Sequence, residues 1–311
     1  MYSVRLPCGF IMKEQGKILA TLEKIRITKR SKIGQKTNRR ISKIIVYTLL
    51  IIGSIAMLLP IFWMVRTSFM TLKQIFMFPI EWIPNPFAWK NYPDAFTIVP
   101  MGKNFLNTLT LVIPALVGDV TTSALSAYGF SRLRWKGREV VFGILLTALM
   151  IPQAITLIPR FLIWSNLKLL NTYWPMIIPT FFGGSVFYVF LLRQFYQTIP
   201  IDLDEAAYMD GANPLQVFWY VILPLSRPAL ITCGVFSVMY WWNDFLGPLI
   251  YLTNPAKYTL ALGLLSFTGY YTTEWHMLMA GATVTVIPII ILFFVAQRYF
   301  IEGITMTGMK V

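Results

Sequence analysis

The stretch IPIDLDEAAYMDGANPLQVFWYVILPLSRPA, residues 199–229, predicts two short helices joined by a turn at Gly211. Pro200 has the residue type that opens a helix, and glycine readily takes the left-handed conformation that ends one. Asn213 and Pro214 then have the residue types of an N-cap and a first helical position, so they begin the second helix. At about ten residues each, both helices reach only about 15 Å, too short to span a membrane. The stretch therefore predicts a helix–glycine–helix elbow that lies along a membrane face.

The first helix of this elbow has an acidic N-terminal end and one side with small side chains. Its first turn holds Asp202, Asp204 and Glu205, where carboxylates offset the positive end of the helix dipole. Ala206 and Ala207 follow and keep one side of the helix free of bulky groups. This pattern is also compatible with a plain solvated connector that has conventional caps.

Long apolar runs lie on both sides of the elbow, and a membrane helix needs about 20 such residues. We expect each run to be one helix, because lipid leaves no backbone group unpaired, and the alternating pattern of a membrane barrel is not seen. The six runs are Ile44–Val65, Phe105–Phe130, Val140–Pro159, Tyr173–Leu192, Ala229–Leu252 and Met277–Ala296. The sequence therefore predicts an all-α, polytopic membrane protein with six transmembrane helices.

The composition supports a membrane protein and excludes several other classes. Of the 311 residues, 56% are hydrophobic and 13% charged, whereas about 25% of an ordinary soluble domain is charged. One histidine and two cysteines exclude a metal site built from His and Cys, and also a disulfide framework. Cys8 and Cys233 lie far apart in different settings, and we expect both to be free thiols.

Most of the formal net charge of +14 lies in the basic arm, residues 1–43. A basic arm next to an apolar run is typical of the inner face of an anionic membrane, so we expect membrane lipids rather than nucleic acid as its partner. The first run starts too late and is too long for a cleaved signal peptide. With the arm in the cytoplasm, six crossings place the tail, residues 301–311, in the cytoplasm as well. The membrane domain between them covers residues 44–300.

The connections between the runs are assigned to sides in the same way. Ser131–Glu139 has four basic residues against Glu139 and is expected in the cytoplasm. The elbow is more acidic than basic, so its cytoplasmic side follows from the parity of the crossings alone. The long connection Arg66–Asn104 is expected outside. Its many Trp, Pro and Phe residues favour an interfacial cap, and a docking surface for an external partner is the alternative.

The elbow and its flanks resemble a known family. Glu205-Ala206-Ala207, Gly211 and Ile222-Leu223-Pro224 are similar to the EAA loop of ABC-transporter importer permeases. The flanking IPIDLDEAAYMDGA, ILPLSRPAL and WWNDFLGPL resemble the carbohydrate-uptake branch, specifically its maltose-permease G-type (MalG-like) subunits. The C-terminal QRYFIEGITMTGMKV is similar to the ending of that branch, and the resemblance covers about residues 43–311.

This resemblance implies the ABC importer type I permease fold, with the elbow, about residues 199–228, as a coupling helix that fits a cleft on a cytoplasmic ATPase subunit. It also implies a second homologous permease subunit, two ATPase subunits and an extracytoplasmic solute-binding protein. The coupling residues that it implies are Glu205, Ala206, Ala207, Asp210 and Gly211.

Nucleotide chemistry is expected to come from those partner subunits. The phosphate-binding pattern G-x-x-x-x-G-K-[ST] does not occur, because Gly16-Lys17 and Gly102-Lys103 are followed by Ile and Asn. ATP and Mg would therefore bind to the ATPase subunits. We expect no cofactor in this chain, and we expect it not to be an enzyme.

The fifth apolar run contains a second set of candidate residues. A carboxylate such as Asp244 costs about 2.5–3.5 kcal/mol at mid-bilayer, so it should face the bundle interior, water or a partner. Aromatic rings beside amide and carboxylate groups suit sugar recognition. The candidate substrate path is Tyr240, Trp242, Asn243 and Asp244. The alternative is that Asp244 pairs internally while the tryptophans face lipid or a neighbouring subunit.

Two further polar or small-residue positions lie in the apolar runs. For Asp119 we expect a role in helix packing. The cluster Gly183-Gly184-Ser185 permits close approach of helices, which we expect between subunits.

The sequence thus predicts a permease subunit of a bacterial, binding-protein-dependent ABC importer in the cytoplasmic membrane, with a sugar or oligosaccharide as cargo. The same machine for glycerol-phosphate, a polyol, an amino acid or a peptide remains an alternative. An ion-coupled secondary transporter is disfavoured, because inverted repeats and paired intramembrane charges are not seen. A single histidine also disfavours a membrane-embedded enzyme.

Overall fold

The computed structural model describes residues 41–269 and 272–306, with side chains described up to residue 297. Cys8 and nearly all of the basic arm lie outside the described residues. The chain forms two compact units, Met1–Trp63 and Met64–Val311. The described part of the first unit is one apolar helix, which begins at Ile41 and continues into the second unit as far as Ser68.

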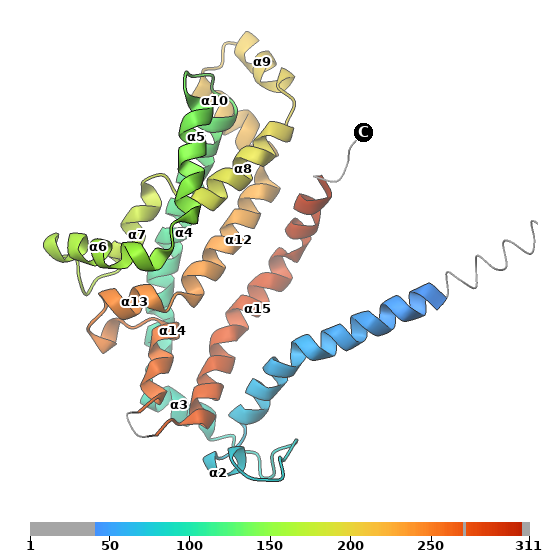
Figure 1. Ribbon diagram of the computed structural model, residues 1–311, viewed down its shortest axis with the longest axis vertical. Coiled ribbons are helices and arrows are strands. Elements are labelled where there is room, and N and C mark those ends of the chain that lie inside the picture. The colour runs from blue at the N-terminus through green and yellow to red at the C-terminus, as the bar shows by residue number, and fades with distance from the viewer. Residues whose placement is uncertain (1–40, 270–271, 307–311) are drawn as a thin grey trace, which may run out of the picture. The chain divides into compact units, whose positions relative to one another are not determined.

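The second unit is helical (Figure 1), and its one isolated bridge among the described residues joins Thr268 and Thr273. The α-helices are α2 (Leu72–Ile75), α3 (Asn91–Ile98), α4 (Met101–Ser131), α5 (Arg138–Thr147), α6 (Gln153–Asn166), α7 (Trp174–Ile177), α8 (Val186–Thr198), α9 (Asp202–Met209), α10 (Pro214–Val217), α11 (Leu223–Leu225), α12 (Arg227–Asn243), α13 (Leu246–Tyr251), α14 (Leu260–Gly263) and α15 (Trp275–Met306). The shorter helical turns are η1 (Ala148–Met150), η2 (Ile178–Phe181), η3 (Phe218–Ile222), η4 (Pro255–Lys257) and η5 (Leu264–Phe267).

Four stretches of the described chain are long and apolar enough to cross a membrane, and two bent pairs bring the number to six if each pair is one span. The four are Ile41–Ser68, Met101–Ser131, Trp174–Thr198 and Trp275–Gln297. They correspond to four of the six predicted runs. The all-α, multi-span architecture predicted from the sequence is therefore confirmed.

The two other runs are sharply bent, and the sequence prediction was wrong about their shape; Tyr173–Leu192 is also interrupted, between η2 and α8. Val140–Pro159 is broken, because its two parts, Arg138–Met150 and Gln153–Asn166, meet at 97°. Pro152 lies at the break, where its missing N–H cannot continue the hydrogen bonding of the preceding helix. In Ala229–Leu252, α12 ends at Asn243 and the chain turns before α13 begins. Asp244 is consequently the residue after a helix and not a mid-helix residue.

The core is built around α4, which packs along α8 and α12, while α12 packs along α15. Close packing of α4 depends on small residues. Gly184 has a φ of +67°, and a Cβ there would lie 2.8 Å from the backbone nitrogen of Ser123 on α4. This glycine therefore packs within the chain, whereas the sequence prediction placed its cluster between subunits.

The connection between the first two spans is ordered and aromatic. It contains α2 and α3, and the Phe69 ring packs against the rings of Phe87, Trp89 and Tyr92 at centroid distances of 5.9, 4.8 and 5.2 Å. Such a cluster agrees with the predicted aromatic cap.

The elbow and the connection Ser131–Glu139 lie at the same end of α4. In Figure 1, α9 and α10 lie at this end, beside the start of α5, and α3 lies at the opposite end. The parity of the crossings predicted that these two connections share a side of the membrane, and both lie at this end of α4.

Candidate functional site

The elbow has the local structure that its sequence predicts. The helix α9 begins at Asp202, two residues after Pro200, and Gly211 follows it with a φ of +85°. Asn213 caps α10, because its Oδ1 accepts the Gln216 N–H at 2.9 Å while the Gln216 Oε1 accepts the Asn213 N–H at 2.7 Å. The second half of the elbow runs from α10 through η3 to α11, and it meets α12 at 79°.

The coupling residues implied by the resemblance divide between two faces of the elbow. Glu205, Ala206, Asp210 and Gly211 are exposed, whereas Ala207 is half-buried against the hydrophobic cluster that contains Tyr128. Ala207 thus attaches α9 to the body of the protein. The outer face also includes an apolar group that sequence reasoning did not single out: 87% of Met209 is exposed. The outer face combines small, acidic and apolar groups, which is suitable for contact with another protein.

Asp204 does not belong to the outer face. Its carboxylate lies 3.5 Å from the Arg132 guanidinium, and only 3% and 4% of the two side chains are exposed. The second Nη of Arg132 donates to the backbone oxygens of Tyr196 and Ile199, at 2.5 and 2.6 Å. Burial raises the pKa of the Asp204 carboxyl, and the positive charge of Arg132 partly offsets this effect. Arg132 therefore ties α9 to the end of α8.

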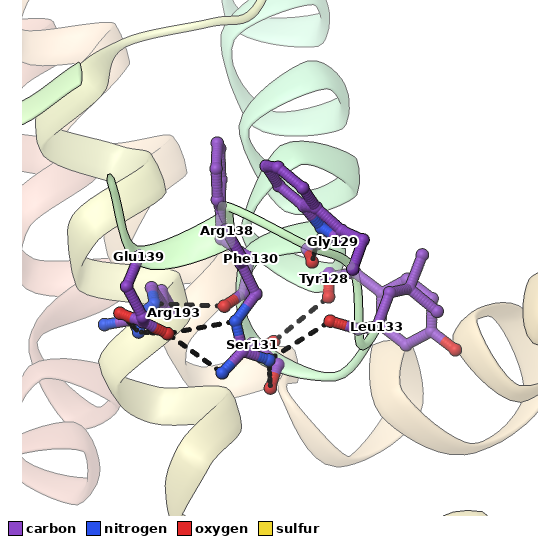
Figure 2. Close-up of polar contacts among 9 residues, drawn as sticks. Tyr128, Gly129, Phe130, Ser131, Leu133, Arg138, Glu139 and Arg193 are labelled. Carbon is purple, nitrogen blue, oxygen red and sulfur yellow. Dashed lines mark hydrogen bonds and ion pairs between the residues drawn. The ribbon is translucent and has the colours of Figure 1, made fainter. Parts of the chain in front are cut away.

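A second arginine makes the reciprocal connection, from α8 to α4 and α5 (Figure 2). Arg193 on α8 donates through Nε to the Phe130 oxygen at 3.1 Å and through Nη2 to both Glu139 oxygens, at 3.0 and 2.8 Å. Its guanidinium lies 4.2 Å from the centre of the Phe142 ring. Arg138 also binds Glu139, at 2.9 Å, and donates to the Leu133 oxygen.

The sequence analysis predicted no role of this kind for Arg132 or Arg193. Arg132 is one of the four basic residues that favour a cytoplasmic side for Ser131–Glu139, and Arg193 belongs to a connection whose side follows from parity alone. Their partners are 72 and 54 residues away along the chain, so no local spacing pairs them. The available signal was the position of each arginine near the end of an apolar run, where the last carbonyls of a helix need donors.

The candidate substrate path does not hold together as a group. Tyr240 and Asp244 line a cavity of about 130 Å³ together with α6, α7 and α13. Trp242 is buried against Phe105 and donates to the Thr285 oxygen at 3.1 Å. Asn243 donates back to the Met239 oxygen at 2.7 Å. Neither of these two residues lines the cavity.

Trp241, which the sequence prediction omitted, lies at the wall of the cavity instead of Trp242. Its Nε1 donates to the Asp119 carboxylate at 2.8 Å, and Ser237 Oγ donates to the same oxygen at 2.8 Å. Asp119 is thus buried with two donors from α12, which agrees with its predicted role in helix packing. Asp244 accepts the Gly247 N–H at 3.2 Å. That bond lies within the chain at the start of α13, in agreement with the alternative prediction of internal pairing.

Residues for metal chemistry are not gathered in the described part of the chain. No group of three or more His, Cys, Asp or Glu side chains there could hold a metal ion. Cys233 is a free, buried thiol, as predicted.

Comparisons with known proteins agree with these observations. The model of the family "Binding-protein-dependent transport system inner membrane component" matches residues 119–305, which include the elbow and the cavity. The chain is similar to a solved structure, a bacterial ABC transporter involved in the import of the acidic polysaccharide alginate. The TM-score is 0.73 at 25% sequence identity, over 84% of this chain and 97% of that one.

Several curated relatives cover most of the chain. The probable ABC transporter permease protein YurM of Bacillus subtilis is 33% identical over 85% of this chain and 88% of its own length. The sn-glycerol-3-phosphate transport system permease protein UgpE of Yersinia pestis is 31% identical over 86% and 97%. The diacetylchitobiose uptake system permease protein NgcG of Streptomyces coelicolor is 31% identical over 87% and 89%.

Proposed function

The chain belongs to the family of binding-protein-dependent transport system inner membrane components, and from this premise we propose that it imports a sugar or a sugar derivative. It is a multi-pass permease subunit of an ABC importer, and its work is transport rather than catalysis. The named cargoes of its relatives are diacetylchitobiose, glycerol-3-phosphate and alginate. They support the carbohydrate-uptake branch, and within it we assign the maltose-permease G type from the motifs around the elbow.

We propose that the outer face of α9 couples the chain to a cytoplasmic ATPase subunit. Glu205, Ala206, Asp210 and Gly211 are exposed together on this face, with Met209 beside them. The small residues permit close approach, and Glu205 offers a charge-assisted hydrogen bond to a basic group of the partner. Ala207 supports the same function from the inner face.

The full machine in this proposal has a second permease subunit, two ATPase subunits and an extracytoplasmic binding protein. The elbow faces the cytoplasm, and so do the basic arm and the tail. ATP and Mg bind to the ATPase subunits, whose closure on ATP moves the elbows and alternates the opening of the permease pair.

One observation carries the coupling proposal: the buried Asp204–Arg132 pair joins α9 to α8. Arg193 extends the connection to α4 and α5. A displacement of α9 by a docked ATPase is therefore transmitted to the ends of two helices, α4 and α8, that line the core. In a connector without such anchors, α9 could move without moving the ends of α4 and α8.

The test is charge reversal on the outer face. We expect Glu205→Arg to leave the permease pair assembled, while the ATPase co-purifies poorly and uptake is uncoupled. The measurement is a tagged pull-down from gently solubilised native membranes, with uptake measured in the same cells. Asp94→Arg is the matched control, because Asp94 is an exposed carboxylate on α3 at the opposite end.

Two results would contradict the proposal. Unchanged transport with Glu205→Arg would remove the coupling role of this face. Wild-type chain that is recovered alone, or only with itself, would show that the elbow is a plain connector.

A further inference from the structure

The cavity beside Tyr240 is one of two adjoining hollows with a common wall. The second hollow has a volume of about 260 Å³, compared with about 130 Å³ for the first. Residues of α6, η2 and α12 line both. The shared lining residues are Gln153, Arg160, Pro179, Tyr240 and Trp241. Asp244 completes the first hollow, and Asp119 lines the second.

The second of the two hollows lies near the middle of α4, the long span that contributes Asp119 to its lining. Asp119 is close to the middle of α4, which has 31 residues and corresponds to about 46 Å of helix. Figure 1 shows α6 beside the middle of α4, while α13 follows directly after the end of α12. A charged side chain at this depth faces water, a partner or a ligand, because lipid does not solvate it.

The three charged groups of the wall differ in how they are satisfied. Asp119 is buried and accepts two hydrogen bonds, and Asp244 accepts the Gly247 N–H. Arg160 is exposed to the hollow. Within the described residues it has neither an ion-pair nor a hydrogen-bond partner. Of these three groups, Arg160 is the cation and the one without a hydrogen-bond partner among the described residues, and its planar fork matches carboxylate and phosphate oxygens.

Two aromatic rings lie beside this guanidinium. Tyr240 and Trp241 meet edge to face, with centroids 5.0 Å apart at 86°, and both line both hollows. Their apolar surfaces can cover the carbon skeleton of a sugar ring, while the Gln153 amide offers polar atoms to hydroxyl groups.

We propose that these hollows form a cargo site for an acidic sugar, in which Arg160 binds the anionic group and Tyr240 and Trp241 contact the ring. This site deepens the proposed function and rests on it. The volumes are below the roughly 300–1,000 Å³ of pockets for drug-sized ligands. The site therefore holds one sugar unit at a time, and the shared chemistry is a carboxylate or a phosphate on a sugar ring.

The experiment compares three probes that share one hexose ring: galacturonate, galactose 1-phosphate and galactose. Binding is measured by titration calorimetry on the whole complex, purified from native membranes in lipid nanodiscs. We expect wild type to bind at least one anionic probe tenfold or more tightly than galactose, a difference of about 1.4 kcal/mol. Whichever anionic probe binds more tightly identifies the group as carboxylate or phosphate.

Two variants test whether Arg160 is the cause. Arg160→Gln should abolish the preference for the anionic probe over galactose, whereas Arg160→Lys should keep part of that preference. Arg134→Gln is the matched control, because Arg134 is exposed in the connection before α5 and lines neither hollow. It should keep the wild-type preference.

Two results would overturn the site. One is equal affinity of wild type for the three probes, including no binding of any of them. The other is a preference that survives in Arg160→Gln. The proposed function is judged separately, because the same preparations show whether an ATPase co-purifies.

Discussion

At the scale of single residues, the two members of the buried pair, Asp204 and Arg132, differ in the other hydrogen-bond partners that they have. Arg132 keeps two backbone oxygens as partners when the carboxylate is removed. Asp204 has no comparable substitute for the guanidinium among its hydrogen bonds in the described structure. Loss of one partner from a buried ion pair typically costs about 3–5 kcal/mol, because the other charge is left uncompensated. The two deletions should therefore differ strongly.

We predict that Arg132→Ala lowers the free energy of unfolding by about 3–5 kcal/mol, and that Asp204→Asn lowers it much less. The measurement is thermal unfolding of the purified complex. Asp202→Asn serves as the control, because Asp202 is an exposed carboxylate two residues earlier on the same helix. Equal losses in Arg132→Ala and Asp204→Asn would show that the pair acts as one symmetric unit.

The difference in stability between wild type and Asp204→Asn should depend on pH, with a definite sign. Burial raises the pKa of Asp204 above its ordinary value of 3.8, so the folded state favours the protonated carboxyl. The stabilisation from this protonation is complete below pH 3.8 and is lost as the pH rises through the raised pKa. Wild type should consequently lose stability relative to Asp204→Asn over that rise. A constant difference at all pH values would contradict the raised pKa.

At the scale of elements, two glycines with positive φ lie next to helix ends, and they differ in how closely other atoms surround them. Gly211, after α9, has a φ of +85°, and a Cβ there would meet no atom within 4 Å. Gly184, before α8, has a φ of +67°, and a Cβ there would lie 2.8 Å from the Ser123 nitrogen. Backbone strain acts at both positions, and steric overlap acts only at the second.

We predict that Gly211→Ala costs about 1–2 kcal/mol of unfolding free energy, the usual cost of the left-handed conformation. Gly184→Ala should cost about 1–3 kcal/mol more, because α4 and α8 must separate. Thermal unfolding of the two variants side by side makes this comparison. Equal losses would show that the contact between Gly184 and α4 relaxes without cost.

The sequence predicted some elements well and others poorly, for identifiable reasons. The elbow was predictable because its caps are local: Asn213, Pro214 and Gly211 act on adjacent backbone. The break at Pro152 was not, because proline does not always break a helix. Pro114 and Pro288 lie inside α4 and α15. Tertiary contacts decide which prolines interrupt a helix, and these contacts are not visible in local spacing.

The candidate substrate path shows the same limit. Tyr240 and Asp244 were found because a carboxylate and aromatic rings in an apolar run are unusual. Trp241 and Trp242 could not be distinguished, because the side of α12 that faces the cavity depends on how it packs against α4. Arg160 was missed because it follows Pro159, outside the predicted run, and joins the site only through the 97° bend that precedes α6.

At the scale of the whole molecule, the elbow and Ser131–Glu139 share one end, and α3 lies at the other. We predict that a membrane-impermeant maleimide labels Asp94→Cys in intact spheroplasts. It should label Lys136→Cys only after permeabilisation, because our proposal places that end in the cytoplasm. Both positions are exposed. The labelling uses a Cys8→Ser background, in which the remaining cysteine, Cys233, is buried. The reverse pattern would invert the proposed orientation.

The double use of Arg132 has a consequence for how the protein is made. During synthesis its positive charge is free, and in the proposed orientation it helps to retain the connection after α4 on the cytoplasmic side. After folding the same charge is enclosed with Asp204 and two carbonyl oxygens. The acidic partner is translated 72 residues later than the arginine. The Arg132 charge that first guides insertion of the nascent chain is thus neutralised only after the elbow has left the ribosome. The contact that fixes the end of α4 therefore forms only after α9 has been synthesised.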